Sequence, residues 1–200
     1  MKNNLPTIFI TILSGGSGKR LWPASSLSCP KQFLLFDYFD YSLFDQTLIR
    51  VNGFIKSSKA AFDVKPIIVS SSNSLNKIQE SITRQNFDCY KIFVEPLSKN
   101  TAPAISIVTK FINDIQKNAI HIILPSDQFI ADNDAFNKAL LEAISNVLIN
   151  KFICLGIKPT FPSTEYGYIK INDNSKNDIC KIVDKFIEKP PIDLAVKYID

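Results

Sequence analysis

Residues 8–20 constrain the fold of this chain more than any other stretch. Residues 8–13 form a continuous, mostly β-branched run without polar alternation, which predicts a strand buried on both faces. Three glycines and two cations follow: Gly15, Gly16, Gly18, Lys19 and Arg20. Glycines allow positive φ and let backbone N–H groups converge on an anion, while the cations supply the charge that phosphate oxygens attract. The stretch therefore predicts a polyphosphate cradle at the end of a buried strand.

Two common phosphate motifs do not fit this loop. A Walker loop ending at Lys19 would need glycine at position 13 and Ser or Thr at position 20, where the chain has Leu13 and Arg20. A dinucleotide fingerprint starting at Gly16 would need its third glycine at position 21, where the chain has Leu21. A plain glycine-rich turn with solvated lysines is the alternative, so the loop alone is weak evidence.

Composition places the chain among globular proteins and excludes several classes of function. It has 200 residues, 46% of them hydrophobic, and a formal net charge of +4. Its apolar runs are far shorter than the ~20 residues that span a bilayer, and no signal-peptide pattern is present. We therefore expect a cytoplasmic protein without membrane association. No basic block interleaves with aromatic residues, so we expect no nucleic-acid partner.

The cysteines do not indicate a metal site or a disulfide framework. The four cysteines are widely spaced without a CxxC pair, and the chain has a single histidine: Cys29, Cys89, Cys154, Cys180 and His121. We expect buried free thiols. His121 alternates inside a predicted strand, so we expect it in the core.

Strands and helices alternate through most of the chain. Strands are predicted at residues 8–13, 66–69, 90–94, 119–124 and 152–155. Helices are predicted to follow the cap residues Ser42, Asn73 and Asp134, and another is predicted to begin near Ala102. Residues 166–171 and 179–187 form two strands without a helix between them. The pattern predicts an α/β fold with a doubly wound, mostly parallel sheet and an antiparallel strand pair near the C-terminus.

Polar clusters fall at the ends of the predicted strands. They comprise the glycine loop and residues 95–101, 126–127 and 188–189. In open parallel sheets, ligands bind outside the carboxyl ends of the strands. Four loops are therefore expected to face one crevice.

Several ordered blocks resemble a known family. They are residues 13–23 with 30–33, 95–105, 124–127, 156–160, 166–169 and 186–190. Together they resemble the bacterial mannose-1-phosphate guanylyltransferases, which belong to the sugar-phosphate nucleotidyltransferases with a Rossmann-like fold. The resemblance covers residues 7–200. It implies transfer from GTP to mannose 1-phosphate, giving GDP-mannose and pyrophosphate with Mg²⁺, for surface polysaccharide biosynthesis. A related transferase with another base or sugar, or an inactive nucleotide-binding fragment, is the alternative.

The resemblance also implies roles for individual residues. The implied catalytic residues are Arg20, Lys31 and Asp127, with Asp127 holding the metal. The implied nucleotide-binding residues are Leu13, Gly15, Gly16, Gly18, Arg20, Lys31, Asn100, Thr101 and Ala102. The implied sugar-phosphate residues are Gly167, Glu188 and Lys189. As alternatives, Asp127 could cap a turn and Glu188–Lys189 could be a solvated pair. Trp22 is expected to pack under the loop.

The chain departs from the family pattern at Lys19, Gln128 and Glu165. We expect residues 1–200 to form one nucleotidyltransferase domain that lacks its C-terminal side, because the family pattern continues beyond residue 200. The chain alone is expected to be poorly active. The sequence does not decide the oligomeric state, and a homo-oligomer is compatible with it.

Overall fold

The protein is described by a computed structural model covering residues 5–16, 21–26, 29–97, 99–147, 152–172 and 180–199. The chain divides into two compact units, residues 1–133 and 134–200. The first unit contains β1 (Thr7–Ser14), η2 (Lys31–Phe33), α1 (Leu43–Ser58), β2 (Asp63–Ser71), η3 (Ser72–Ser74), α2 (Leu75–Arg84), β3 (Lys91–Glu95), α3 (Thr101–Ile115) and β4 (Ile120–Pro125). The second contains α4 (Asn133–Asn146, beginning at the boundary), β5 (Gly167–Ile171), β6 (Val183–Glu188) and α5 (Ile192–Lys197).

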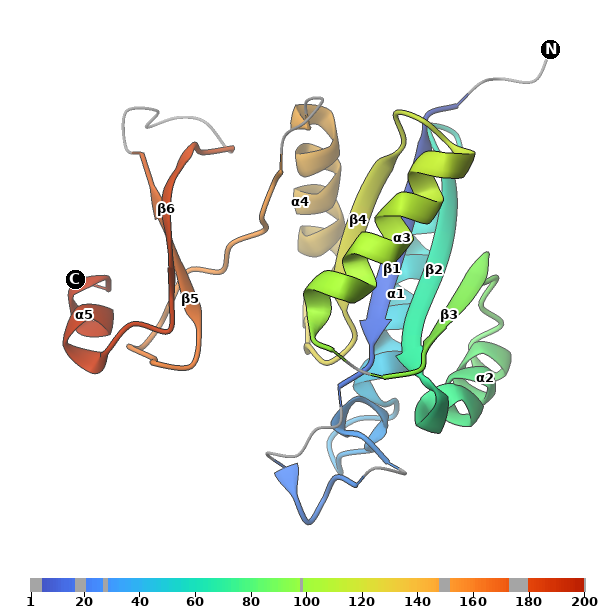
Figure 1. Ribbon diagram of the computed structural model, residues 1–200, viewed down its shortest axis with the longest axis horizontal. Helices are drawn as coiled ribbons and strands as arrows, with labels where there is room; N and C mark the ends of the chain where they lie inside the picture. The colour runs from blue at the N-terminus through green and yellow to red at the C-terminus, as the bar shows by residue number, and fades with distance from the viewer. Residues whose placement is uncertain are drawn as a thin grey trace. The chain divides into compact units, whose positions relative to one another are not determined.

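The first unit is built on a parallel sheet with the strand order β3-β2-β1-β4 (Figure 1). The central strand β1 pairs with β2 and β4, so Ile12 lies opposite both Ile68 and Leu124. Successive strands are added on one side of β1 up to β3, and β4 is then added on the other side. The strand order therefore reverses between β1 and β4, which makes this the topological switch point of the sheet.

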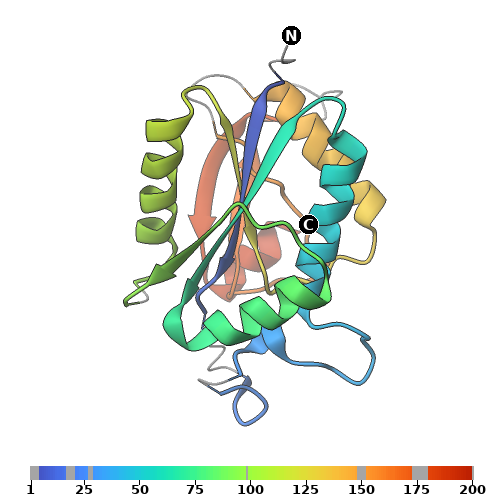
Figure 2. The same cartoon turned by 90° about the vertical axis from the view of Figure 1, so that its right-hand side faces the viewer.

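Helices cover both faces of this sheet, as Figure 2 shows for α3 and α1. On one face, Phe9, Ile67 and Val69 form a buried cluster with three α3 residues: Ala104, Val108 and Ile112. On the α1 helix, the buried apolar residues are Phe44, Leu48, Val51 and Phe54. Residues 8–10 and 12 of β1 are fully buried, as expected for a strand covered on both sides. The doubly wound α/β architecture is confirmed.

The starts of α1 and α2 follow different local chemistry. The Ser42 hydroxyl caps α1 by accepting a hydrogen bond from the Asp45 backbone N–H at 3.1 Å, as predicted. The predicted Asn73 cap of α2 is wrong. Asn73 lies inside the 3₁₀ turn η3, and α2 begins after Ser74, because the Ser72–Ser74 run forms a tighter turn before the helix starts.

The second unit carries the predicted antiparallel pair. β5 and β6 pair with Gly167 opposite Glu188, and Tyr168 packs against Tyr198 with ring centroids 5.5 Å apart. The predicted strand at residues 152–155 is wrong. These residues form no ladder, and Phe152 is 99% exposed. A short apolar run can form a strand only where a partner edge is available, so the described parallel sheet has four strands, not five.

The structure also shows the surroundings of the cysteines and of the histidine. The four cysteines are free thiols, but the prediction that they are buried is wrong, since Cys154 is exposed and the other three are only partly buried. His121 is partly buried in β4, where its ring nitrogens lie 2.8 Å from Thr11 Oγ1 and 3.1 Å from Thr109 Oγ1. In the part of the chain that the structure describes, no helix combines the length and apolar character needed to cross a membrane.

Candidate functional site

The switch point between β1 and β4 brings two of the predicted loops together. Gly15 and Gly16 follow β1, and Ser126 and Asp127 follow β4. Ser126 joins the two strand ends, because its backbone N–H and its hydroxyl both donate to the Leu13 carbonyl, at 3.2 and 2.7 Å. Ligands of doubly wound sheets bind at such a point. The fold therefore holds Asp127 beside the glycine turn.

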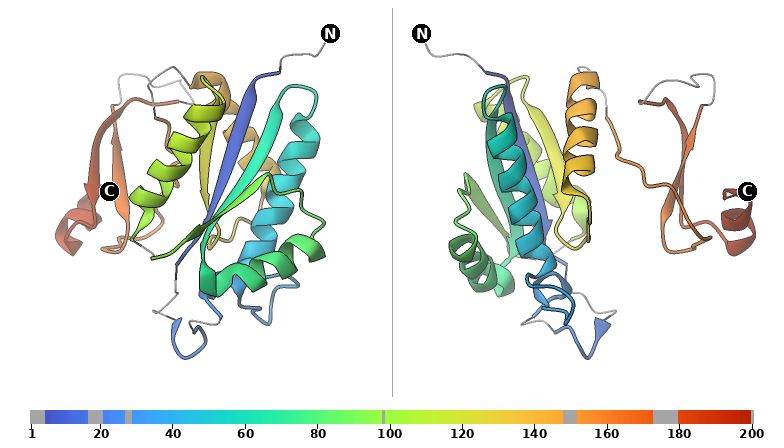
Figure 3. Two further views of the ribbon diagram at one scale, coloured as in Figure 1. Left: turned by 45° about the vertical axis from the view of Figure 1, so that its right-hand side comes forward. Right: turned by 180° about the vertical axis from the view of Figure 1, so that it is seen from behind.

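Lys31 completes this group of charged residues. It opens the short helix η2 in segment 29–42, which lies beyond the carboxyl ends of the strands (Figure 3). Its Nζ lies 2.5 Å from Asp127 Oδ2, and the two side chains are 36% and 34% exposed. The structure thus brings together two residues that lie almost 100 positions apart in the sequence. A cation that can bind phosphate and a carboxylate that can bind a metal share one edge of the sheet.

The predicted cradle is described only in part. Leu13 is half-buried at the end of β1, Gly15 is half-buried and Gly16 is exposed. Gly18, Lys19 and Arg20 lie outside the described residues, so their predicted roles stay predictions.

A buried glutamine contacts this turn, and the sequence motifs alone assigned it no role. Gln32 Nε2 lies 3.2 Å from the Ser14 carbonyl oxygen and 3.3 Å from that of Gly16. Its place after Lys31 in the 30–33 block was the one available signal, but a motif does not tell which way a side chain points.

The loop after β3 lies at the same edge of the parallel sheet. Partial burial raises the pKa of Glu95 at its start. Asn100 has φ 64° and ψ −171°, a left-handed backbone conformation that non-glycine residues seldom adopt, and it precedes α3 without making a side-chain cap. Thr101 and Ala102 are the exposed first residues of that helix. The predicted base-side residues therefore lie at an accessible helix start.

The predicted sugar-phosphate residues lie together in the second unit. Gly167 and Glu188 are cross-strand partners, and Glu188 Oε1 lies 2.9 Å from Lys189 Nζ. The close neighbour of Gly167 is the Phe186 ring, which any Cβ at position 167 would overlap. Glu188 and Lys189 are exposed, so the alternative of a solvated ion pair remains open.

The described residues near the switch point offer few ligands for a metal ion. Within the described ranges, no group of three or more His, Cys, Asp or Glu residues could hold a metal ion. Magnesium often binds through one carboxylate together with substrate phosphates and water. A single half-exposed carboxylate at Asp127 fits that mode, with phosphate oxygens supplying the remaining ligands.

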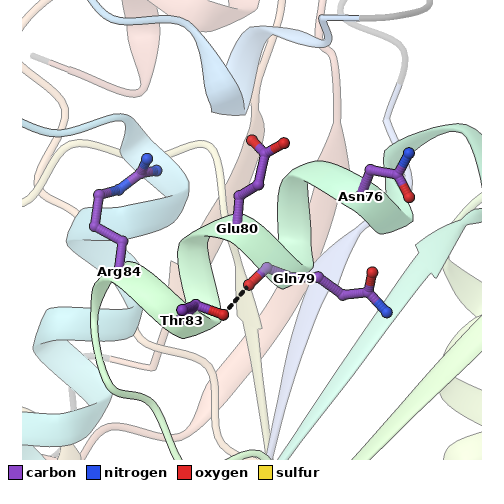
Figure 4. A pocket seen from close by; sticks show the side chains of 5 residues that line it. All are labelled: Asn76, Gln79, Glu80, Thr83 and Arg84. Carbon is purple, nitrogen blue, oxygen red and sulfur yellow. Dashed lines mark hydrogen bonds between the residues drawn. The ribbon is translucent and has the colours of Figure 1, made fainter.

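Two surface hollows in the described part of the chain lie away from the predicted site. A hollow of about 610 Å³ lies along α2 and is lined by Asn76, Gln79, Glu80, Thr83 and Arg84 (Figure 4). All five side chains come from one helix, so no second element supplies converging groups. A smaller hollow of about 250 Å³ is lined by Tyr41, Gln46, Ile49, Arg50, Ile130 and Asn133. Neither contains a predicted site residue.

The prediction that Trp22 packs under the loop is wrong. Trp22 is 79% exposed, in a turn closed by the hydrogen bond from Ser25 N–H to the Leu21 carbonyl. This turn carries the indole outward and leaves Phe33, which is 9% exposed, to pack against Phe44 instead. Of the two described departures from the family pattern, Gln128 is exposed and the Glu165 backbone N–H donates to Ser163 Oγ.

The chain is similar in sequence to a known family and to proteins of several bacteria. The sequence model of a family described as Nucleotidyl transferase matches residues 10–200. The chain is 34% identical to the alginate biosynthesis protein AlgA of Pseudomonas fluorescens, over 94% of this chain and 38% of that protein. It is 32% identical to a mannose-1-phosphate guanylyltransferase of Salmonella montevideo, over 94% of this chain and 39% of that protein.

A solved structure shows the same fold. A Thermus thermophilus protein described as a mannose-1-phosphate geranyltransferase superposes with a TM-score of 0.75 and 27% identity, covering 98% of this chain and 53% of that one. The chain spans about two fifths of the length of the curated relatives it matches.

Proposed function

The chain belongs to the nucleotidyl transferase family, and we therefore propose that it catalyses nucleotidyl transfer from GTP to mannose 1-phosphate. The products are GDP-mannose and pyrophosphate, which would place the protein in polysaccharide biosynthesis. The observation that carries the proposal is the meeting of the glycine turn, Lys31 and Asp127 at the switch point between β1 and β4. The name of the guanylyltransferase relative supports the choice of substrates, and that of the alginate relative supports a place in polysaccharide biosynthesis.

The reaction asks mainly for positioning and charge compensation. An oxygen of the sugar phosphate attacks the α-phosphorus, and the bond from that phosphorus to the oxygen bridging to the β-phosphate breaks as pyrophosphate leaves. Lys31 would exchange its carboxylate partner for α-phosphate oxygens and offset the charge that develops there. Asp127, released from Lys31, would hold magnesium. Bound magnesium would neutralise phosphate charge and help align the reacting oxygens.

The remaining predicted residues are assigned by their own chemistry. We assign the base to the exposed start of α3 at Asn100, Thr101 and Ala102. We assign the sugar phosphate to Glu188 and Lys189, whose carboxylate and ammonium suit hydroxyl groups and a phosphate respectively. Arg20 would grip the triphosphate with its planar guanidinium.

Pyrophosphate release from a matrix of substrates tests the proposal. Each of GTP, ATP, CTP and UTP would be combined with mannose, glucose and N-acetylglucosamine 1-phosphates in the presence of magnesium. We expect release above background only with GTP and mannose 1-phosphate. Release with another pair would favour a related transferase, and GTP binding without any release would favour an inactive nucleotide-binding fragment.

A further inference from the structure

The side chain of Gln32 is buried at the carboxyl end of β1. It is 2% exposed, and Ser14, which it contacts, is 1% exposed. Gln32 Nε2 lies 3.2 Å from the Ser14 carbonyl oxygen, 3.3 Å from Ser14 Oγ and 3.3 Å from the Gly16 carbonyl oxygen. An amide –NH₂ has two hydrogens, so it can serve both carbonyl groups at once.

Among the residues that the structure describes, few contacts restrain Gly16. It is exposed, and a Cβ built on it would meet nothing within 4 Å, so packing does not restrain this residue. Glycine also has the widest choice of backbone conformations. The hydrogen bond from Gln32 therefore restrains the orientation of the Gly16 carbonyl group.

The Ser14 carbonyl is held more redundantly. Ser70 Oγ, from β2, also donates to it at 3.1 Å. Removing either donor leaves the other in place at Ser14, whereas removing Gln32 also leaves the Gly16 carbonyl without its donor. Ser70 is thus a matched control, equally buried and bound to the same strand end.

The neighbour of Gln32 in η2 reaches the other half of the site. Lys31 Nζ pairs with Asp127 Oδ2, which follows β4. Two consecutive residues of η2 therefore contact the turn after β1 and the carboxylate after β4. A shift of this short helix would change the glycine turn and the ion pair together.

We infer that Gln32 is a positioning residue that holds the Gly15–Gly16 turn in its phosphate-receiving conformation and aligns it with the Lys31–Asp127 pair. The inference rests on the proposed function, since it names how the nucleotide half of that site is set before the ligand arrives. Because its side chain is buried, Gln32 is assigned to the support of the turn and not to contact with the nucleotide.

Calorimetric titration of GTP into Gln32→Leu and Ser70→Ala tests this inference. Each lost hydrogen bond weakens an equilibrium by up to about tenfold, so Gln32→Leu should weaken GTP binding by roughly tenfold. Ser70→Ala should stay within about twofold of the unaltered chain, because the Gly16 carbonyl keeps its donor. Amide hydrogen exchange at Gly15 and Gly16, followed by NMR without nucleotide, should accelerate in Gln32→Leu and not in Ser70→Ala.

A second variant, Gln32→Glu, separates positioning from general destabilisation. A carboxylate cannot donate to the carbonyl groups, but a protonated carboxyl can donate to one of them, and burial raises the pKa of such a group. The GTP affinity of Gln32→Glu, divided by that of the unaltered chain at each pH, should recover in part as the pH falls from 8 to 5.5. The same ratio for Gln32→Leu should not change with pH.

The outcomes distinguish this inference from the proposed function. If the unaltered chain does not bind GTP, the proposed function is overturned and this inference with it. If the unaltered chain binds GTP while Gln32→Leu binds it equally well with unchanged amide exchange, the inference alone is overturned. A pH-independent ratio for Gln32→Glu would also overturn it.

Discussion

The Lys31–Asp127 pair joins opposite charges 2.5 Å apart near the carboxyl ends of β1 and β4. Because about one third of each side chain is exposed, water screens the pair, and such pairs contribute about 0–1 kcal/mol to stability. Both groups are therefore free to exchange partners when a nucleotide and a metal ion arrive. Loss of either group should affect ligand binding far more than folding.

Replacing Asp127 with Asn tests this separation. We expect Asp127→Asn to abolish magnesium-dependent pyrophosphate release, because the one carboxylate placed at the switch point is lost, while the melting temperature changes by no more than a few degrees. Activity assays across a magnesium series and a thermal melt measure the two effects. Asp114→Asn, which breaks the exposed Lys110–Asp114 pair on α3, is the matched control and should keep full activity. A large drop in melting temperature with activity intact would identify Asp127 as a turn cap.

Replacing Arg20 with Ala tests the predicted cradle. We expect Arg20→Ala to weaken GTP binding by about 1.5–3 kcal/mol, because a charge-assisted hydrogen bond to phosphate is lost. Calorimetric titration measures the affinity, with Lys117→Ala as a control for a change in overall charge at an exposed residue after α3. Unchanged affinity in Arg20→Ala would remove this residue from the site.

At the scale of secondary-structure elements, α1 and α2 are joined by a partly buried polar network. Asp45 accepts a hydrogen bond from Ser42 Oγ at 2.6 Å and one from Arg84 Nη2 at 2.9 Å. Burial alone would raise the pKa of Asp45, but hydrogen bonds from Ser42, Arg84 and Ser81 lower it overall. The start of α1 is therefore held both by its own cap and by the end of α2.

Replacing Ser42 with Ala should weaken this junction. We expect the free energy of unfolding to fall by about 1–2 kcal/mol, because α1 loses its cap and Asp45 loses a buried partner. Urea denaturation at pH 7 measures the change. Ser58→Ala, whose hydroxyl only bonds back to the Phe54 carbonyl near the end of the same helix, should cost less than about 0.5 kcal/mol. Equal losses in the two variants would contradict the role of Ser42 as a cap.

At the scale of the whole molecule, stability should depend on the one histidine. His121 lies between β1 and α3, and burial lowers its pKa from 6.5 to about 4. The unfolded chain takes up a proton near pH 6.5, whereas the folded protein does so only near pH 4. His121 therefore leaves the free energy of unfolding unchanged above about pH 7. Below that, the free energy of unfolding decreases as the pH falls from about 6.5 to 4.

A pH series of urea denaturation checks this dependence. We expect the free energy of unfolding to fall by on the order of 2 kcal/mol between pH 7 and pH 4. Below about pH 4, a second decline should follow as Asp45, whose pKa is lowered in the folded state, becomes protonated. His121→Gln removes the titrating ring and should abolish the first decline only. A first decline of equal size in His121→Gln would assign it to other groups.

Local patterns in the sequence determined most elements of the first unit. The β-branched run before Gly15 predicted β1, and Ser42 predicted the start of α1, because burial on both faces and helix capping each leave a mark within a few residues. The alternation of strands and helices predicted a doubly wound sheet with polar loops at one edge. The ordered motifs then indicated the family.

Only the tertiary structure decided what depends on partners distant in the chain. Residues 152–155 have an apolar sequence but pair with none of the described strands, and Trp22 points outward because a local turn directs it there. The Lys31–Asp127 pair and the two carbonyl contacts of Gln32 arise from the strand order, which sets β4 beside β1. A sequence pattern indicates which face of a strand or helix is buried. Which groups meet at the switch point follows from the order in which strands are added, and that order is settled by packing of the whole unit.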